Sequence, residues 1–175
     1  MVIVAILMAV GVPSYRYVTT DNRMSTEVNE LLGDLEFARS EAVREGQTIT
    51  VCAAATSSTP SSPSCAATGA TAWQNGWIVF LDTNNDQQID STSDSVLRIQ
   101  SAFLGGDTFA SSGSGATNLG AFTFNRSGFV NQLGTSQVTV TLKDSTANSA
   151  YTRCLYLTLA GMLSVQTHAQ NSSCS

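Results

Sequence analysis

Hydrophobic and polar positions divide the start of the chain into two unlike parts. Residues 1–12 are all apolar or glycine, whereas charged residues recur after Pro13. This pattern predicts one long helix whose first part packs against lipid or other apolar helices, because a half-exposed helix carries polar positions on one side. At about 1.5 Å per residue the apolar run measures only ~18 Å, against a bilayer core of ~30 Å. We expect either partner helices beside it or a chain that lacks its natural beginning.

Two other interpretations of this run stay open. A cleaved secretory signal has an apolar core of similar length, but no Lys or Arg precedes the run, no A-x-A site follows it, and the first cation is Arg16. A buried core helix is the second alternative, and the lack of polar side chains across residues 1–12 argues against a half-exposed position for it.

After Pro13 the spacing of apolar residues predicts an amphipathic helix. The stripe recurs at intervals of four and three residues and consists of Met24, Val28, Leu31, Leu35, Ala38 and Ala42. Leu32 and Val43 widen it, and Gly46 is placed to form a left-handed cap. Pro13 removes one backbone hydrogen bond and predicts a kink, which Gly11 reinforces. A helix reaching residue 45 would be ~67 Å long, which indicates an assembly or a membrane.

The rest of the chain has the character of strands and loops. β-Branched and aromatic runs predict strands at 48–53, 76–81, 96–100, 121–125, 129–131, 138–142, 154–159 and 162–166. Tight turns are predicted at 126–128 and 160–161, and loops or flexible connections at 54–72, 105–106 and 111–120. This order predicts an α+β fold in which antiparallel sheets pack on the helix stripe.

Composition narrows the class of protein. With 175 residues the chain can form one domain with an appendage. Only 12% of residues are charged, and the net charge of −5 argues against general affinity for nucleic acid or anionic membrane surfaces. The carboxy-terminal part is mildly basic, because residues 121–175 contain the cations Arg126, Lys143 and Arg153 but only one acid, Asp144.

The four cysteines indicate an oxidising compartment. Cys52, Cys65, Cys154 and Cys174 are widely spaced and include no C-x-x-C pair, which makes a zinc site a poor interpretation. Four cysteines allow three pairings. We favour Cys52–Cys65 and Cys154–Cys174, because each bond would fasten a polar loop or tail to an adjacent strand. Disulfides would place the protein in the periplasm or outside the cell, and free buried thiols in a cytosolic protein are the alternative.

Several blocks of sequence together resemble a known family. They are Val-Ala-Ile-Leu at 4–7, Val-Pro-Ser-Tyr at 12–15, Ala-Arg-Ser-Glu-Ala at 38–42, a cysteine-containing first strand, and Gly-Trp-Ile-Val-Phe-Leu-Asp at 76–82. The chain is similar to the H-type minor pseudopilins, the GspH/FimT/FimU group of type II secretion and type IV pilus systems. The resemblance extends from Met1 to about Val165.

The resemblance implies a non-enzymatic filament subunit with a pilin-like fold and no cofactor. Residues 1–46 would form the pilin helix, with 1–13 as its truncated membrane or filament-core part, and 47–175 the β-rich globular domain. The helix would cross the bacterial inner membrane once, with the globular domain in the periplasm, or outside the cell once assembled in a pilus. The partners would be other pilins or pseudopilins of the same filament. The membrane and assembly residues would be Val4, Ile6, Leu7, Val10 and Pro13.

The family's leader, its cleavage glycine, the methylated phenylalanine and an early glutamate have no counterpart here. On this resemblance we expect a truncated or mis-started chain.

A polar segment that follows residue 81 has part of a calcium-loop pattern. Asp82, Asn84, Asp86 and Asp90 offer oxygen ligands at alternate positions. Gln87 stands where the motif has glycine, and Ser93 replaces the bidentate glutamate at position twelve of the loop. We therefore favour a polar turn, stabilised by side chains that bond to their own backbone, over a calcium site.

Catalytic patterns are weak. His168, the single histidine, lies in a polar tail where a solvated position is expected, and no G-x-S-x-G elbow is present. Trp73 and Trp77 are expected to pack a sheet onto the helix rather than stack on a ligand. The carboxylates Glu27, Glu30 and Asp34 share one helix face, which is expected to be solvated. We predict no catalytic residues.

DNA uptake is the alternative function. Some FimT-like members bind DNA through a G-R-x-R motif in the last hairpin, but residues 161–164 here are Gly-Met-Leu-Ser, without either arginine. Arg126, Lys143 and Arg153 are the weak DNA candidates, because three cations would give only a salt-dependent contact with phosphates. DNA is therefore not expected to be a principal partner.

Overall fold

The computed structural model describes residues 2–103 and 105–174, with side chains from residue 15 onward. Within these ranges one long helix is followed by nine strands and a short 3-10 helix, in the order α1 (Val2–Glu45), β1 (Ile49–Ala53), β2 (Gly76–Leu81), β3 (Ser95–Ser101), β4 (Thr108–Ser112), β5 (Ala121–Phe124), β6 (Val130–Asn131), β7 (Gln137–Lys143), η1 (Ser149–Tyr151), β8 (Arg153–Thr158) and β9 (Leu163–Thr167).

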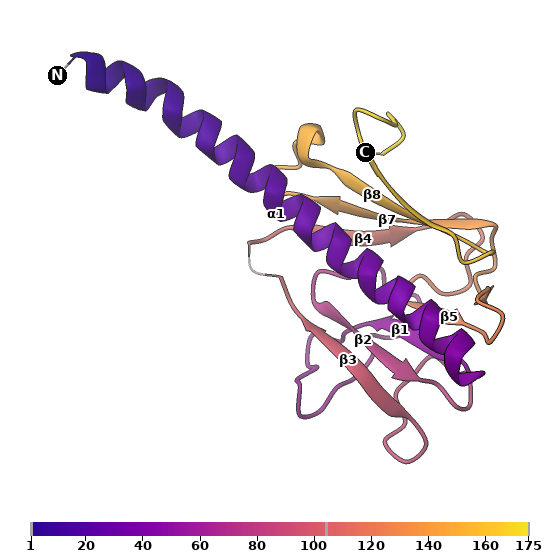
Figure 1. Cartoon of the computed structure of the whole chain (residues 1–175). Coiled ribbons are helices and arrows are strands. Elements are labelled where there is room, and N and C mark those ends of the chain that lie inside the picture. Colours follow the sequence, from indigo (N-terminus) through magenta and orange to yellow (C-terminus); the bar gives the residue numbers. More distant parts are fainter. Residues whose placement is uncertain (1, 104, 175) are drawn as a thin grey trace.

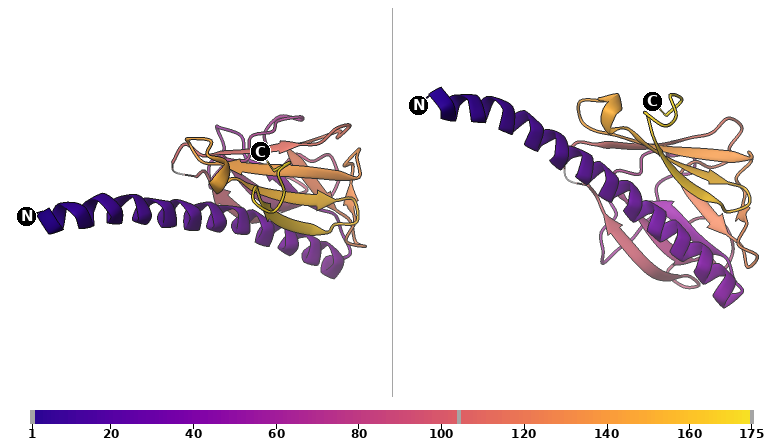
Figure 2. Two further views of the ribbon diagram at one scale, coloured as in Figure 1. Left: turned by 90° about the horizontal axis from the view of Figure 1, so that it is seen from above. Right: turned by 45° about the horizontal axis from the view of Figure 1, so that its top comes forward.

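The strands form two antiparallel sheets that pack against the same side of α1. One sheet has the order β3-β2-β1-β5-β6 and the other β4-β7-β8-β9. Figures 1 and 2 show both sheets beside the carboxy-terminal part of α1, while its amino-terminal part extends beyond them. The predicted α+β arrangement of one long helix packed on antiparallel sheets is confirmed.

The apolar stripe of α1 forms the centre of the core. Met24, Val28, Leu31, Leu35, Ala38 and Ala42 are each at most 1% exposed, as the spacing predicted. Leu32 packs at the edge of this core, but Val43 is 54% exposed and does not join it. The helix ends as predicted at Gly46, whose φ is 70° and whose N–H donates to the carbonyl of Ala42 at 3.0 Å.

The first part of α1 is helical through Pro13 without interruption and curves gradually in the ribbon (Figure 2), so the kink expected at Pro13 is not seen. The side chains of residues 1–14 lie outside the described part of the structure. The membrane and assembly residues predicted among them, Val4, Ile6, Leu7, Val10 and Pro13, therefore stay predictions.

Both tryptophans are fully buried, in agreement with their predicted packing role. Trp73 stacks on Phe122 with ring centroids 4.9 Å apart, and its indole N–H donates to the carbonyl of Leu119 at 3.1 Å. Trp77 contacts Phe109 edge-on at 6.3 Å between centroids. These rings fill the space between the two sheets and α1.

The sequence pattern missed strand β4, because its sequence, Thr-Phe-Ala-Ser-Ser, has a single large apolar residue, and it also missed the short helix η1. The last two residues of β4 fall within the flexible connection expected at 111–120. The strand's residues alternate between exposed and buried, and Phe109 is completely buried. Pairing with β7 along Thr108–Ser112 supplies the stability that its composition lacks.

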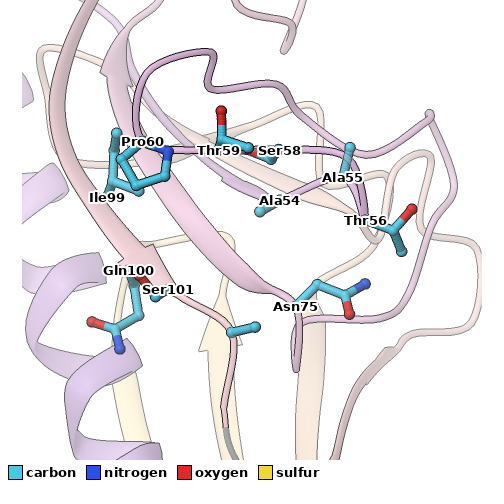
Figure 3. Close-up of a pocket in the computed structure, with 11 residues that line it drawn as sticks. Ala54, Ala55, Thr56, Ser58, Thr59, Pro60, Asn75, Ile99, Gln100 and Ser101 are labelled. Atoms are coloured by element: carbon cyan, nitrogen blue, oxygen red, sulfur yellow. The ribbon is translucent and has the colours of Figure 1, made fainter.

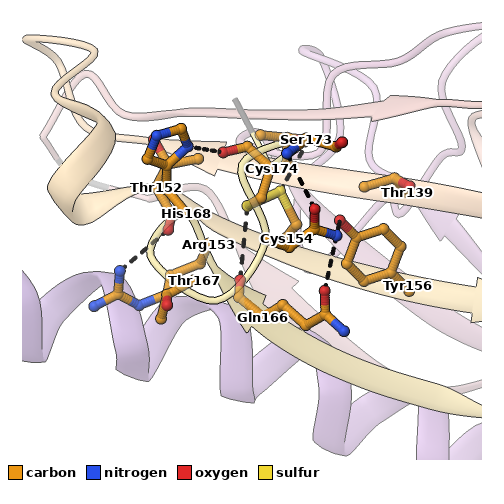
Figure 4. The surroundings of a disulfide bond; sticks show 12 residues. Thr139, Thr152, Arg153, Cys154, Tyr156, Gln166, Thr167, His168, Ser173 and Cys174 are labelled. Atoms are coloured by element: carbon orange, nitrogen blue, oxygen red, sulfur yellow. Dashed lines mark hydrogen bonds between the residues drawn. A yellow bond between two sulfur atoms is a disulfide. The ribbon is translucent and has the colours of Figure 1, made fainter.

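Two disulfides fasten long loops to strands. Cys52 bonds to Cys65 and Cys154 to Cys174, across separations of 13 and 20 residues. The first bond ties the loop at 54–72 to β1, and the second ties the carboxy-terminal tail to β8 (Figure 4). These are the two pairs that the sequence analysis favoured.

Candidate functional site

The amino-terminal part of α1 projects beyond the globular body. Tyr17 packs against Tyr151 of η1 with ring centroids 5.4 Å apart, at the point where the helix leaves the body. Residues 2–16 would extend about 22 Å past this contact at 1.5 Å per residue. Tyr15 is 72% exposed, and Tyr17 and Val18 are each 52% exposed. Large apolar side chains grouped in this way indicate a surface suited to a protein or lipid contact.

Charged contacts surround the helix where it leaves the body. We call this group the helix-exit cluster; its members are Tyr17, Asp21, Arg23 and Glu27 of α1 together with Asp107, Tyr151 and Arg153. Arg23 reaches both oxygens of Asp107 at 3.0 Å. Arg153 pairs with Asp21, and its side chain is only 7% exposed. The cluster therefore fixes the helix to the turn before β4 and to the start of β8.

Glu27 is the buried acid of this cluster. The residue is 6% exposed, although its position on a charged helix face predicted a solvated side chain. Burial, together with the nearby carboxylate of Asp107, raises the pKa of Glu27 to about 7. The sequence pattern missed this because the turn at 105–107, which covers Glu27, is distant in sequence.

Asp34, from the same predicted solvated face, is also engaged. Its Oδ2 accepts a hydrogen bond of 2.8 Å from the indole of Trp77, and its Oδ1 pairs with Arg98 of β3 at 2.7 Å. The Arg98 guanidinium lies 3.6 Å from the centroid of the Phe37 ring. Of the three carboxylates on this face, Glu30 alone is exposed as expected. Edge strand β3 thus packs over part of a helix face that the sequence analysis expected to be solvated.

A second exposed apolar group lies where two hairpins meet the end of α1. We call it the hairpin patch; its members are Val43, Phe129, Leu159 and Met162, which are 54%, 50%, 48% and 65% exposed. The hairpins touch at Gly128 and Gly161, where a Cβ on Gly161 would lie 2.1 Å from the Gly128 carbonyl oxygen. Arg39 of α1 donates to that carbonyl at 3.1 Å. The glycines thus permit the close contact that gathers the patch.

The calcium-like segment is a hydrogen-bonded turn. Asp82 is completely buried and accepts hydrogen bonds from Thr50 Oγ1 at 2.7 Å and from the backbone N–H groups of Asp86 and Gln87. Burial raises the pKa of Asp82, and these hydrogen bonds oppose that rise. In the described ranges no group of three or more His, Cys, Asp or Glu is arranged to hold a metal ion.

The other two acids of this segment bond locally. Asp90 accepts from the backbone and hydroxyl of Thr92, and Asp86 accepts from the side chain of Asn84 at 2.9 Å. The geometry therefore fits the polar turn that the sequence analysis favoured over a calcium site.

The three cations suggested for DNA do not form one patch. Arg153 is buried against Asp21 and donates to the carbonyl of Ala150. It also donates to the carbonyl of Thr152 (Figure 4). Lys143 is the last residue of β7, whereas Arg126 lies in the turn between β5 and β6. This turn is near the first residue of β7, because Leu159 is hydrogen-bonded both to Ser136, just before β7, and to Val130 of β6. A seven-residue strand spans about 20 Å, so the charges of Arg126 and Lys143 do not act together.

Neither His168 nor the pocket beside β3 offers reactive chemistry. His168 is half-buried rather than solvated as expected, because its Nδ1 contacts the carbonyl of Cys174 at 2.7 Å (Figure 4). A pocket of about 180 Å³ opens between the disulfide-bonded loop and the end of β3 (Figure 3). It is lined by residues such as Pro60, Asn75 and Ile99 and by no titratable side chain.

Among the helices described, none is both long and apolar enough to cross a membrane.

Comparison with known proteins gives a consistent result. A family described as "Type II transport protein GspH" matches residues 27–161. The fold is similar to that of the type IV minor pilin FimU of Pseudomonas aeruginosa in two crystal forms, space groups P21 and P65, with TM-scores of 0.61 and 0.58 and 17% sequence identity in each case. The alignments cover 85% and 83% of this chain and 91% and 94% of FimU. No curated protein matches the sequence.

Proposed function

Because the chain belongs to the GspH family of type II transport proteins, we propose that it is a structural minor pseudopilin or minor pilin. It joins a filament of pilin-like subunits, at or near the tip, and so supports protein secretion or pilus biogenesis. Its partners are other pilins or pseudopilins of the same filament.

The observation that carries this proposal is the incomplete cover of α1. The helix has 44 residues, and the body covers its apolar stripe only from Met24 to Ala42. Tyr15, Tyr17 and Val18 stay exposed on the projecting part. In a filament, helices of neighbouring subunits would cover this surface and remove apolar area from water at about 25 cal/mol per Å².

The distribution of exposed apolar side chains also supports assembly. The projecting helix and the hairpin patch lie at opposite ends of the molecule (Figure 1). Contacts between unlike surfaces at two ends are heterologous, and such contacts build open helical filaments rather than closed pairs. A subunit of this design therefore fits a filament better than a symmetric dimer.

The proposal extends to location. Residues 1–13 would belong to the single helix in the inner membrane, and the globular part, 47–175, would lie in the periplasm or outside the cell after assembly. The two disulfides support an oxidising compartment for this part. We assign no enzymatic activity, in keeping with the structural role of the family.

The test is co-purification from the native membrane. The full-length tagged protein should capture other pilin-like subunits, and replacing Tyr15 and Val18 with serine should weaken capture several-fold. Substitution of Thr26, an exposed residue on the covered part of α1, with serine is the matched control. If the native protein is a free monomer that captures no pilin-like subunit, the proposal is wrong.

DNA uptake is not proposed as a second function. Of the three cations that the sequence analysis suggested, Arg153 is paired with Asp21. Arg126 lies in the β5–β6 turn of the five-stranded sheet and Lys143 in β7 of the four-stranded sheet, so the two cations do not join into one phosphate-binding surface.

A further inference from the structure

Glu27 and Asp107 bring two carboxyl groups together in a buried position. Glu27 is 6% exposed and Asp107 4% exposed. Glu27 Oε2 finds no hydrogen-bond partner among the described residues. A buried carboxylate without a partner is costly, because it has lost its hydration and gained nothing in return.

The charges around Glu27 do not balance it. Arg23 contacts both oxygens of Asp107, and the backbone N–H of Ser145 donates to Asp107 at 3.2 Å. The cation therefore pairs with Asp107, and its charge offsets only part of the effect of burial and of Asp107 on Glu27. The other acid facing Glu27 is Glu30, one turn along α1, and Asp144, close enough to Arg23 to be affected by its charge, adds a further negative group. A proton on Glu27 removes the excess negative charge and supplies a donor for Asp107.

The position of this group gives the proton a mechanical effect. Glu27 and Arg23 lie on the exit segment of α1, while Asp107 lies in the turn between β3 and β4, which connects the two sheets. Gly105 in this turn has a φ of 149°, and a Cβ there would lie 2.2 Å from Arg23 Nη1. Gly105 thus leaves room for the Arg23 guanidinium beside Asp107, and a shift of this turn that moves Asp107 would change the contact that holds α1.

We propose that Glu27, Asp107 and Arg23 form a proton-operated clasp where α1 leaves the body. When protonated, Glu27 donates a hydrogen bond to Asp107 and the clasp holds residues 17–27 against the turn. When Glu27 ionises, two adjacent carboxylates share one guanidinium, and the exit segment loosens. The consequence for assembly depends on the proposed filament function: the clasp regulates the angle at which the projecting helix is presented to neighbouring subunits.

The pH range follows from the direction of the linkage. The pKa of Glu27 is raised from 4.5 to about 7 by burial and by Asp107. When folding raises the pKa of an acid, its proton stabilises the closed state fully at pH values below the unfolded pKa. This stabilisation is lost as the pH rises through the folded pKa. A pKa change of this size corresponds to a change of roughly 300-fold in the opening equilibrium. The clasp therefore loosens mainly as the pH rises from about 4.5 to about 7.

Hydrogen exchange of the full chain in detergent tests the clasp. From about pH 5 to about pH 9, protection factors of residues 17–27, corrected for intrinsic exchange, should fall at least ~10-fold and at most ~300-fold. Residues 31–42 of the same helix, which pack on the core, are the internal control and should change little. Glu27→Gln, a neutral residue of the same shape, should remove the pH effect. Glu30→Gln, on the exposed neighbour, should keep it.

Two results would overturn the clasp. One is a pH effect that persists unchanged in Glu27→Gln, and the other is an equal loss of protection in residues 17–27 and 31–42. If Glu27→Gln does not fold, Asp107→Asn provides the second test, because it removes the repelling charge and should also flatten the pH response. The exchange measurement needs no partner subunit, so a negative result would contradict the clasp but not the filament proposal. A negative co-purification result would contradict the filament proposal but not the clasp.

Discussion

The indole N–H of Trp77 donates a hydrogen bond of 2.8 Å to the carboxylate of Asp34 and so joins β2 to α1 by a polar contact beside an apolar core. Trp77 is completely buried, and Asp34 also pairs with Arg98 on the neighbouring strand β3. One helix carboxylate therefore connects two strands of the five-stranded sheet.

Loss of the Asp34 carboxylate should destabilise the body. In Asp34→Ala the buried indole N–H of Trp77 loses its acceptor, so we expect the unfolding free energy to fall by about 1–3 kcal/mol. Urea unfolding followed by tryptophan fluorescence measures this change. Glu36→Ala, on the exposed face of the same helix, is the control and should change stability by less than about 0.5 kcal/mol. Equal effects of the two substitutions would contradict the role of Asp34.

Two glycine-to-alanine substitutions should have opposite effects. Gly33 lies in the middle of α1, and a Cβ added there would meet no atom within 4 Å, so Gly33→Ala should stabilise the protein by roughly 0.5–1 kcal/mol. Gly161 has a φ of 72°, and its Cβ would overlap the Gly128 carbonyl, so Gly161→Ala should destabilise by about 1–3 kcal/mol. Thermal unfolding of both variants decides this. A neutral Gly161→Ala would mean that the two hairpins do not touch.

Removing either disulfide should lower stability by about 2–4 kcal/mol, because the unfolded chain regains the freedom of a closed loop. The variants are Cys52→Ser with Cys65→Ser, and Cys154→Ser with Cys174→Ser. Denaturant unfolding measures the loss, and peptide mapping under non-reducing conditions checks the pairing. Recovery of a Cys52–Cys154 peptide from the native protein would contradict the fold around β1 and β8.

Stability should decline with rising pH through the titration of Glu27. Its folded pKa of about 7 exceeds the ordinary 4.5, so the folded state holds the proton more tightly, and stability is lost as the pH rises across this interval. The loss is at most about 3 kcal/mol. Comparing the unfolding free energies of the native chain and Glu27→Gln across this interval isolates the contribution. If the native curve and the Glu27→Gln curve are parallel, the buried acid does not titrate as described.

Millimolar Ca²⁺ should leave the unfolding temperature unchanged. Asp82 already accepts hydrogen bonds from Thr50 and from two backbone N–H groups, so a metal ion would have to displace them. Thermal scans with Ca²⁺ and with a chelator measure this, and Mg²⁺ is the control for ionic strength. A specific rise with Ca²⁺ would show that the segment at 82–90 rearranges to bind metal.

The sequence alone was sufficient for the elements whose patterns are local. The helix stripe from Met24 to Ala42, the cap at Gly46 and the strand at 76–81 follow from periodicity and composition. The spacing of the cysteines and the character of the loops between them favoured the pairing that the structure contains. Each of these signals depends on residues close together in the chain or on a repeated spacing.

Tertiary structure decided which charged residues are buried. Glu27 and Asp34 were expected to be solvated because they share an acidic face with Glu30 at the edge of the apolar stripe. Asp107 and Trp77, which are distant in sequence, pack against them in the folded chain. Strand β4 has little apolar content and exists because β7 supplies its hydrogen-bond partners. Periodicity reports which face of an element is apolar, but burial of a polar group depends on what packs over it, and only the folded chain brings those parts together.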